Sequence, residues 1–183
     1  MPALVTCRKN APCAKGCYAR NGNYKYPSVM KSHAENFAAY VESPTNYFDT
    51  VDKYIKKHKT EYFRWHGAGD IVDETYLKGM VKVAKNNPDT HFLAYTKQFE
   101  IVNKYLDKGY RFPKNLKVLF SNWDKNFNIS NPYGRPMTFV KFKNAELTPE
   151  LPVKGATVCP GSCENCKKCW ELRKGQSVIF NQH

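Results

Sequence analysis

The stretch YFRWHGAGDI, residues 62–71, sets the architecture of this 183-residue chain. Its first half is rich in aromatic side chains and predicts a β-strand, while Gly67 and Gly69 break its second half before Asp70. A helical pattern of apolar residues then begins at Asp73. The stretch therefore predicts a strand, a glycine-rich loop and a helix in succession.

The chain after this stretch repeats the same pattern. A helix is expected from Phe99 to a glycine cap at Gly109, and further strands are expected at 91–96, 116–121, 137–142 and 155–159, before an apolar ending at 177–180. Strands alternating with helices over short connections indicate a mainly parallel sheet. The length is too small for an eight-unit barrel of about 250 residues. We expect one α/β domain over residues 1–183, an open or partial TIM-like barrel.

The chain before this stretch predicts a short strand and two helices. Residues 3–6 are apolar enough for a strand that delivers Cys7, and a helix follows with Ser28 as its N-cap. Pro44 is expected to end that helix, and a second helix is expected at 45–58.

The seven cysteines form two terminal groups, with none between Tyr18 and Val158. Their odd number and the absence of a signal-peptide pattern disfavour a disulfide scaffold and favour a reducing cytoplasm. The second group has the crowded spacing C-x3-C-x2-C-x2-C, which is typical of a thiolate-bound metal or iron–sulfur cluster. We predict as metal ligands Cys7, Cys13, Cys17, Cys159, Cys163, Cys166 and Cys169.

The number of metal centres is left open by the spacing. A division into three and four thiols predicts two [4Fe-4S] clusters, whereas a single cluster with cysteines from both ends would tie the termini together. A structural zinc on the last four cysteines is the alternative, although zinc usually takes two pairs separated by a longer knuckle.

The carboxyl ends of parallel strands lie at one edge of the sheet, where α/β proteins bind ligands. We therefore expect both cysteine groups to meet at one rim, near the loop after residue 65. His66 and Asp70 are candidate catalytic residues there, and Tyr95 is a candidate cofactor contact. The alternative is that His66 packs at the rim and that Asp70 caps the following helix.

The chain is strongly basic, with 29 Lys and Arg against 16 Asp and Glu and a formal charge of +13. This charge favours a polyanionic partner such as nucleic acid, or a host protein, although many lysines are also typical of solvated helix faces. No apolar run is long enough to cross a membrane, so we expect a cytoplasmic protein. The sequence does not indicate an oligomeric state.

Four motifs in this order give the chain a family resemblance: CYA at 17–19, FRWHGAGD at 63–70, LAYTK at 93–97 and the cysteine run that ends in CW at 169–170. Together they resemble the uncharacterised gene product 88-like family of bacteriophages. The resemblance implies a phage-encoded protein, expressed in the host cytoplasm, whose seven cysteines are family features.

A more distant likeness is to radical S-adenosylmethionine enzymes, which are partial barrels. It implies that Cys7, Cys13 and Cys17 hold a cluster and that Gly67, Gly69 and Asp70 form a cofactor-binding loop. S-adenosylmethionine is then a candidate cofactor. The spacing C-x5-C-x3-C departs from the usual C-x3-C-x2-C. Two function classes follow: an iron–sulfur enzyme of redox or radical type, or a basic binding module stabilised by zinc or a cluster.

Overall fold

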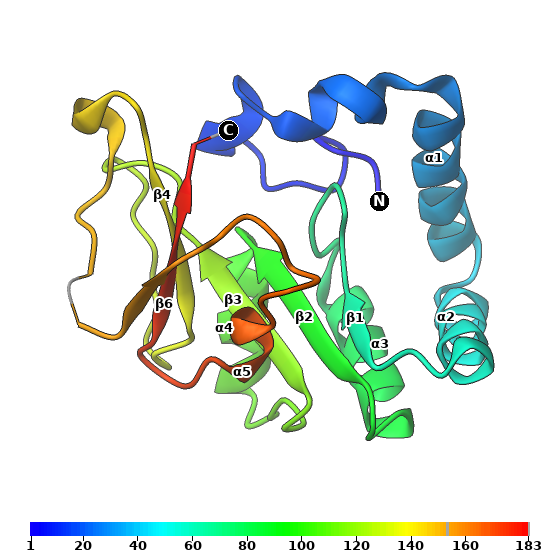
Figure 1. Ribbon diagram of the computed structural model, residues 1–183. Coiled ribbons are helices and arrows are strands. Elements are labelled where there is room, and N and C mark those ends of the chain that lie inside the picture. Colours follow the sequence, from blue (N-terminus) through cyan, green and yellow to red (C-terminus); the bar gives the residue numbers. More distant parts are fainter. Residues whose placement is uncertain (153, 183) are drawn as a thin grey trace.

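The computed structural model describes residues 1–152 and 154–182, and its centre is a parallel sheet (Figure 1). Within these residues the sheet has six strands in the order β1-β2-β3-β4-β6-β5, and every pair is parallel. The strands are β1 (Tyr62–Arg64), β2 (His91–Thr96), β3 (Leu116–Ser121), β4 (Met137–Lys141), β5 (Ala156–Val158) and β6 (Ser177–Asn181). The sheet does not close, so the prediction of an α/β fold with an open or partial barrel is confirmed.

The strand predictions are accurate in the middle of the chain and incomplete at its end. Strands β2 and β3 occupy the predicted residues, whereas β1 is shorter than the aromatic stretch suggests. The apolar ending was not expected to be a strand, yet β6 lies between β4 and β5 and pairs with both. Its five residues carry no turn or pairing signal of their own, so only the tertiary structure identifies this position.

Five α-helices occur in the described part of the chain: α1 (Pro27–Glu42), α2 (Pro44–His58), α3 (Glu74–Asn86), α4 (Phe99–Asp107) and α5 (Lys168–Glu171). None of them is long and apolar enough to cross a membrane. The N-cap of α1 is Tyr26 rather than the predicted Ser28, and Pro44 begins α2 instead of merely ending α1. Both prolines stand in a first helical turn, where the N–H that proline lacks has no intrahelical partner anyway.

The predicted strand at residues 3–6 is wrong, because this segment forms a turn. The backbone N–H and the hydroxyl of Thr6 both donate to the Pro2 carbonyl, at 3.3 and 3.1 Å. Leu4 takes a left-handed φ of 67°. These local hydrogen bonds replace the strand pairing that four apolar residues would otherwise need.

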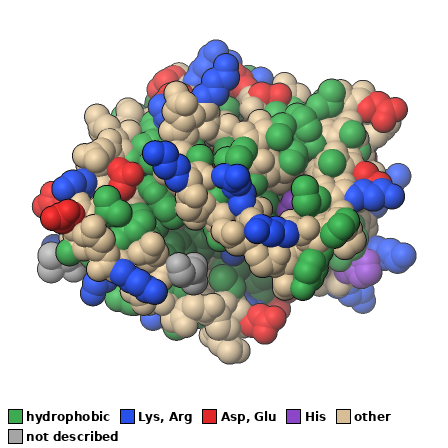
Figure 2. Space-filling model, turned by 90° about the horizontal axis from the view of Figure 1, so that it is seen from above, with side chains coloured by type: hydrophobic (Ala, Val, Ile, Leu, Met, Phe, Trp, Pro, Cys, Tyr) green, Lys and Arg blue, Asp and Glu red, His purple; other side chains and the backbone are tan. Residues whose placement is uncertain are grey.

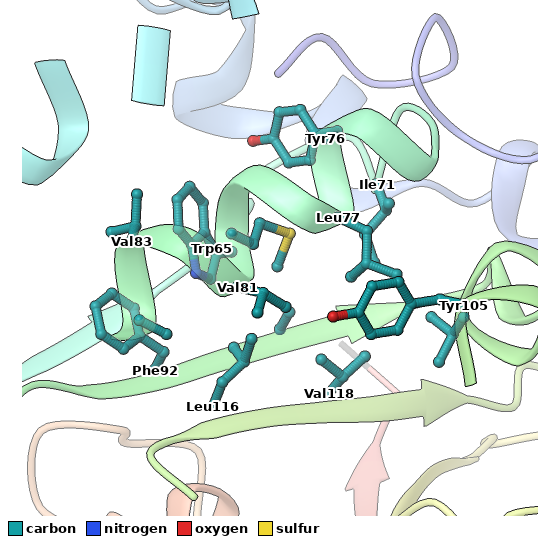
Figure 3. Close-up of a cluster of buried hydrophobic side chains, with 14 of the residues drawn as sticks. Trp65, Ile71, Tyr76, Leu77, Val81, Val83, Phe92, Tyr105, Leu116 and Val118 are labelled. Carbon is teal, nitrogen blue, oxygen red and sulfur yellow. The ribbon is translucent and has the colours of Figure 1, made fainter. Parts of the chain in front are cut away.

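The sheet separates two hydrophobic layers. On one face, α3 and α4 pack against alternate residues of β2 and β3, and Figure 3 shows Leu77 and Val81 above Phe92, Leu116 and Val118. The opposite face is covered by α5 and the cysteine-rich segment before it, whose side chains pack on Leu93 and Leu119. Since neighbouring residues of a strand point to opposite faces, the sequence of β2 serves both layers.

Candidate metal centre

The N-terminal cysteine group lies on turns and short 3-10 helices that precede α1. Cys7, Cys13 and Cys17 are half-buried free thiols. Burial raises the pKa of Cys7, and the nearby charges of Asp70, Cys13 and Cys17 raise it further. Burial likewise raises the pKa of Cys13, where the charge of Lys97 acts in the opposite direction. The three cysteines lie in one short segment before α1, and this segment carries the first group.

The N-terminal cysteine segment is hydrogen-bonded to the glycine-rich loop that follows β1. The hydroxyls of Tyr18 and Tyr24 both donate to the Gly67 carbonyl, at 2.9 and 3.0 Å. Gly69 has a φ of 76°, and a Cβ atom there would overlap Thr6 and Met1. Gly69 thus allows the N-terminal segment to approach the loop closely, and Gly67 anchors that segment through its carbonyl, which gives both residues a positioning role where we predicted contact with a cofactor.

Asp70 joins three parts of the rim. Its buried carboxylate accepts hydrogen bonds from the Ile71 N–H at 2.7 Å, the Thr96 hydroxyl at 2.6 Å and the Lys97 N–H at 2.8 Å. Burial raises the pKa of Asp70, and these hydrogen bonds partly oppose the rise. The alternative of a helix cap is wrong, because Asp73 caps α3 by accepting from the Tyr76 N–H.

His66 lies at the start of the same loop in a left-handed conformation, with a φ of 60°. Although its backbone is partly exposed, both ring nitrogens are buried and have no hydrogen-bond partner among the described residues. Burial lowers the pKa of His66 to about 3, and the positive charge of Arg64 contributes in the same direction. The imidazole is therefore neutral at pH 7, packed beside the Tyr76 ring at 5.4 Å between centroids.

The C-terminal cysteine group runs from the end of β5 to α5. Cys159 follows β5 and its sulfur accepts a 3.4 Å hydrogen bond from the Gly161 N–H. Cys169 is buried on α5 and packs against the sheet. Burial raises the pKa of Cys169, the Tyr95 hydroxyl beside it lowers the pKa, and the charges of Cys159, Cys163 and Cys166 raise it. These four thiols form the second group.

Arg64 is the last residue of β1. Its guanidinium lies 5.2 Å from the centroid of the Tyr95 ring. Burial raises the pKa of Tyr18, and the positive charge of Arg64 opposes that rise. Figure 2 looks onto the molecule from above and shows hydrophobic side chains in a hollow, with Lys and Arg side chains around it.

The seven cysteines have the right chemistry for a thiolate-bound metal or cluster. Their sulfurs, however, are not positioned around a common point. Across residues 1–152 and 154–182, no three His, Cys, Asp or Glu side chains are grouped closely enough to hold a metal ion. Thiolates are the ligands preferred by zinc and iron–sulfur clusters, and such sites generally close only when the metal binds. The loops around 7–17 and 159–169 would have to draw their sulfurs together.

Three residues of this region were not found from the sequence. Thr6 and Tyr24 hold the N-terminal segment on the loop, and Lys97 donates from its ammonium to the Ser121 hydroxyl at 3.0 Å. Only for Lys97 did the sequence pattern indicate a place at the site, because Lys97 directly follows a predicted strand whose end was expected at the rim. No sequence pattern indicated such a place for Thr6 or Tyr24.

The fold and these residues define a class of protein: an open α/β sheet whose two cysteine-rich segments lie around the carboxyl ends and one face of its strands. The chain belongs to the family described as Gene product 88, whose sequence model matches residues 1–171. The Gene 88 protein of Mycobacterium phage L5 is 25% identical over 194 residues, covering 92% of this chain and 78% of that protein. No solved structure matches the chain. The expected relationship to the phage gene product 88-like proteins is confirmed.

Proposed function

We propose that this chain is an iron–sulfur protein that carries one or two [4Fe-4S] clusters on its cysteines. The observation that supports this best is that all seven thiols are free and lie in two short segments, one before α1 and one that runs from β5 into α5. Cys7, Cys13 and Cys17 would hold one cluster, and the four C-terminal cysteines would hold the other. A single cluster shared by both ends is the competing arrangement.

A bound [4Fe-4S] cluster supplies single electrons, and one held by only three thiolates leaves an iron open to a further ligand. Other residues of the chain control water access and charge around the cysteines. Trp170 and Leu172 pack beside Cys169 on the sheet and exclude water from it. Arg64 lies over the ring of Tyr95, whose hydroxyl is beside Cys169, and its positive charge would offset the negative charge of thiolates there.

The proposed chemistry is redox or radical-type and takes place at the rim. His66 supplies a neutral imidazole, and Asp70 positions the loop through its three hydrogen bonds. S-adenosylmethionine is the candidate ligand, because the distant likeness to radical enzymes points to it.

The first test is purification without oxygen, followed by absorption spectroscopy and analysis of iron, sulfide and zinc. We expect a broad absorption with stoichiometric sulfide. The triple variants C7S/C13S/C17S and C163S/C166S/C169S should each lose about half of the iron if each group holds one cluster. The variant S162A, which lies within the second group but removes no thiol, serves as the control and should keep all of it.

Two other results would change the assignment. Loss of all iron in either triple variant would show that both ends share one cluster. One zinc per chain without sulfide would contradict the iron–sulfur proposal and leave a zinc-stabilised binding module. Incubation of the reduced protein with S-adenosylmethionine then separates the function classes, because release of deoxyadenosine supports an enzyme, whereas an intact cluster without release supports an electron-transfer or sensing module.

A further inference from the structure

The edge of the sheet opposite Asp70 carries a group of positive side chains. Lys117 lies near the start of β3, Arg135 lies two residues before β4, and Arg173 and Lys174 precede β6. Because all the strands are parallel, these positions share the amino edge of the sheet. We call these four residues the amino-edge basic cluster.

Specific contacts join the segments that carry these four residues. The Gly175 N–H donates to the Gly134 carbonyl at 3.0 Å, which joins the two loops that lead into β4 and β6. The side chain of Lys174 lies against Gly134, so closely that a Cβ atom there would come within 2.7 Å of Lys174 Cε. Arg135 donates from Nε and Nη2 to the Val118 carbonyl, at 3.3 and 3.1 Å, and therefore reaches the strand that carries Lys117.

The charge of this cluster is not neutralised within the described residues. The ion pairs found there use other cations: Arg8, Lys31, Lys56, Lys78, Lys82 and Lys108. Burial lowers the pKa of Lys117, and the positive charges of Arg135 and Arg173 lower it further. Burial lowers the pKa of Arg135 to about 10, so this guanidinium is still charged at pH 7. Like charges held together in this way favour the binding of an anion.

The shape and exposure of the cluster fit an extended anion. Arg173 and Lys174 are exposed, while Arg135 is fixed by its bonds to Val118. Arginine and lysine together are the usual partners of phosphate, and a chain with a formal charge of +13 attracts a polyanion over long range. We propose that the amino-edge basic cluster binds the phosphate backbone of a nucleic acid. This inference does not depend on the proposed metal centre.

The test is fluorescence anisotropy with a labelled DNA duplex and a labelled single-stranded RNA, each titrated over a range of salt concentrations. The double variant R173Q/K174Q removes two exposed charges of the cluster. Its control, K53Q/K57Q on α2, removes two exposed lysines that form no ion pair within the described residues. We expect the cluster variant to bind about tenfold more weakly or worse, and its salt dependence to fall by about 2 in logarithmic slope.

The control variant should change the affinity by less than about threefold, because its lysines lie away from the proposed contact. Equal weakening by both variants would overturn the proposal, since the binding would then come from charge spread over the whole surface. Absence of binding by the unmodified protein at low salt would overturn it as well. Circular dichroism of both variants checks that they are folded, and their iron content reports separately on the metal centre.

Discussion

The hydroxyl of Thr96 donates a 2.6 Å hydrogen bond to the buried carboxylate of Asp70 and in turn accepts a 2.9 Å bond from the Gln98 N–H. This pair ties the loop after β1 to the end of β2, and the same loop holds the N-terminal cysteine segment. The stability of the rim therefore depends on one threonine that is 1% exposed.

The variant T96V tests this dependence. Loss of a buried hydrogen bond to a charged group should lower the free energy of unfolding by about 1.5–3 kcal/mol. The comparison is T90V, since the Thr90 hydroxyl donates only to the neutral Thr60 carbonyl, and we expect a cost of about 1 kcal/mol. Urea unfolding at pH 7 measures both. A cost for T96V no larger than that for T90V would contradict the assignment.

The cost of T96V should also depend on pH. Burial raises the pKa of Asp70, and the Thr96 hydroxyl lowers it by stabilising the ionised carboxylate. A carboxyl whose pKa is higher in the folded chain loses stability as pH rises from its unfolded pKa to its folded pKa. Without the hydroxyl the folded pKa is higher still, so the variant loses more over this range. Unfolding measured at pH 4 and pH 7 should show the larger cost at pH 7.

His66 should make the protein sensitive to mild acid. Burial lowers the pKa of His66 to about 3, whereas the unfolded chain has an ordinary histidine that takes up a proton near pH 6.5. The unfolded state binds more protons over this interval, so stability falls as pH decreases, by up to about 2 kcal/mol between pH 6.5 and pH 5. The variant H66N, which tolerates a left-handed φ, should flatten this part of the stability profile. The exposed His58 supplies the control H58N, whose profile should follow that of the unmodified protein.

Gly79 in α3 should respond to substitution in the opposite way to an ordinary helical glycine. Alanine normally stabilises a helix interior by about 1 kcal/mol relative to glycine. Here a Cβ atom would overlap the Phe48 ring, which packs α2 onto α3. We expect G79A to destabilise the protein by about 1–3 kcal/mol. The double variant F48L/G79A makes room for the methyl group, and thermal unfolding should show less than the summed cost of the single changes.

The carboxylate of Glu74 forms ion pairs with two lysines on the surface. Lys108 and Lys78 contact its carboxylate at 2.6 and 3.0 Å. Hydrogen bonding to Lys108, followed by that to Lys78, lowers the pKa of Glu74 to about 2. An NMR titration should therefore show a higher pKa in K108A, with a smaller rise in K78A. An unchanged value in K108A would mean that the ion pair does not persist in solution.

The parallel sheet was predictable because β2 and β3 are continuous apolar runs with helices before and after them. Residues such as Leu93 and Leu119 belong to a layer on the second face of the sheet, and the apolar runs reflect burial on both faces. The position of β6 was not predictable, since the order of strands in a sheet depends on long-range packing rather than on local pattern.

The residues of the candidate site could be proposed from the sequence, whereas the hydrogen bonds that position them could not. The cysteines and the loop at 66–70 follow from spacing and from the rule that strand ends carry ligands. The roles of Tyr24 and Thr6 could not be predicted, because each contacts the loop at a residue more than 40 positions away in the sequence. Asp70 was a candidate catalytic residue with a helix cap as the alternative, and the structure shows its carboxylate accepting hydrogen bonds from Thr96 at the end of β2 and from Lys97 directly after it.

The position of β6 has a consequence for how the protein is made. Strand β5 pairs only with β6, and β6 pairs with β4 on its other side. During synthesis on the ribosome, β5 emerges before the strand that must separate it from β4. Until residues 177–181 have left the exit tunnel, β4 and β5 each present an unpaired edge. The segment with the four C-terminal cysteines connects β5 to β6, so both of its ends are fixed only after β6 has paired with β4 and β5.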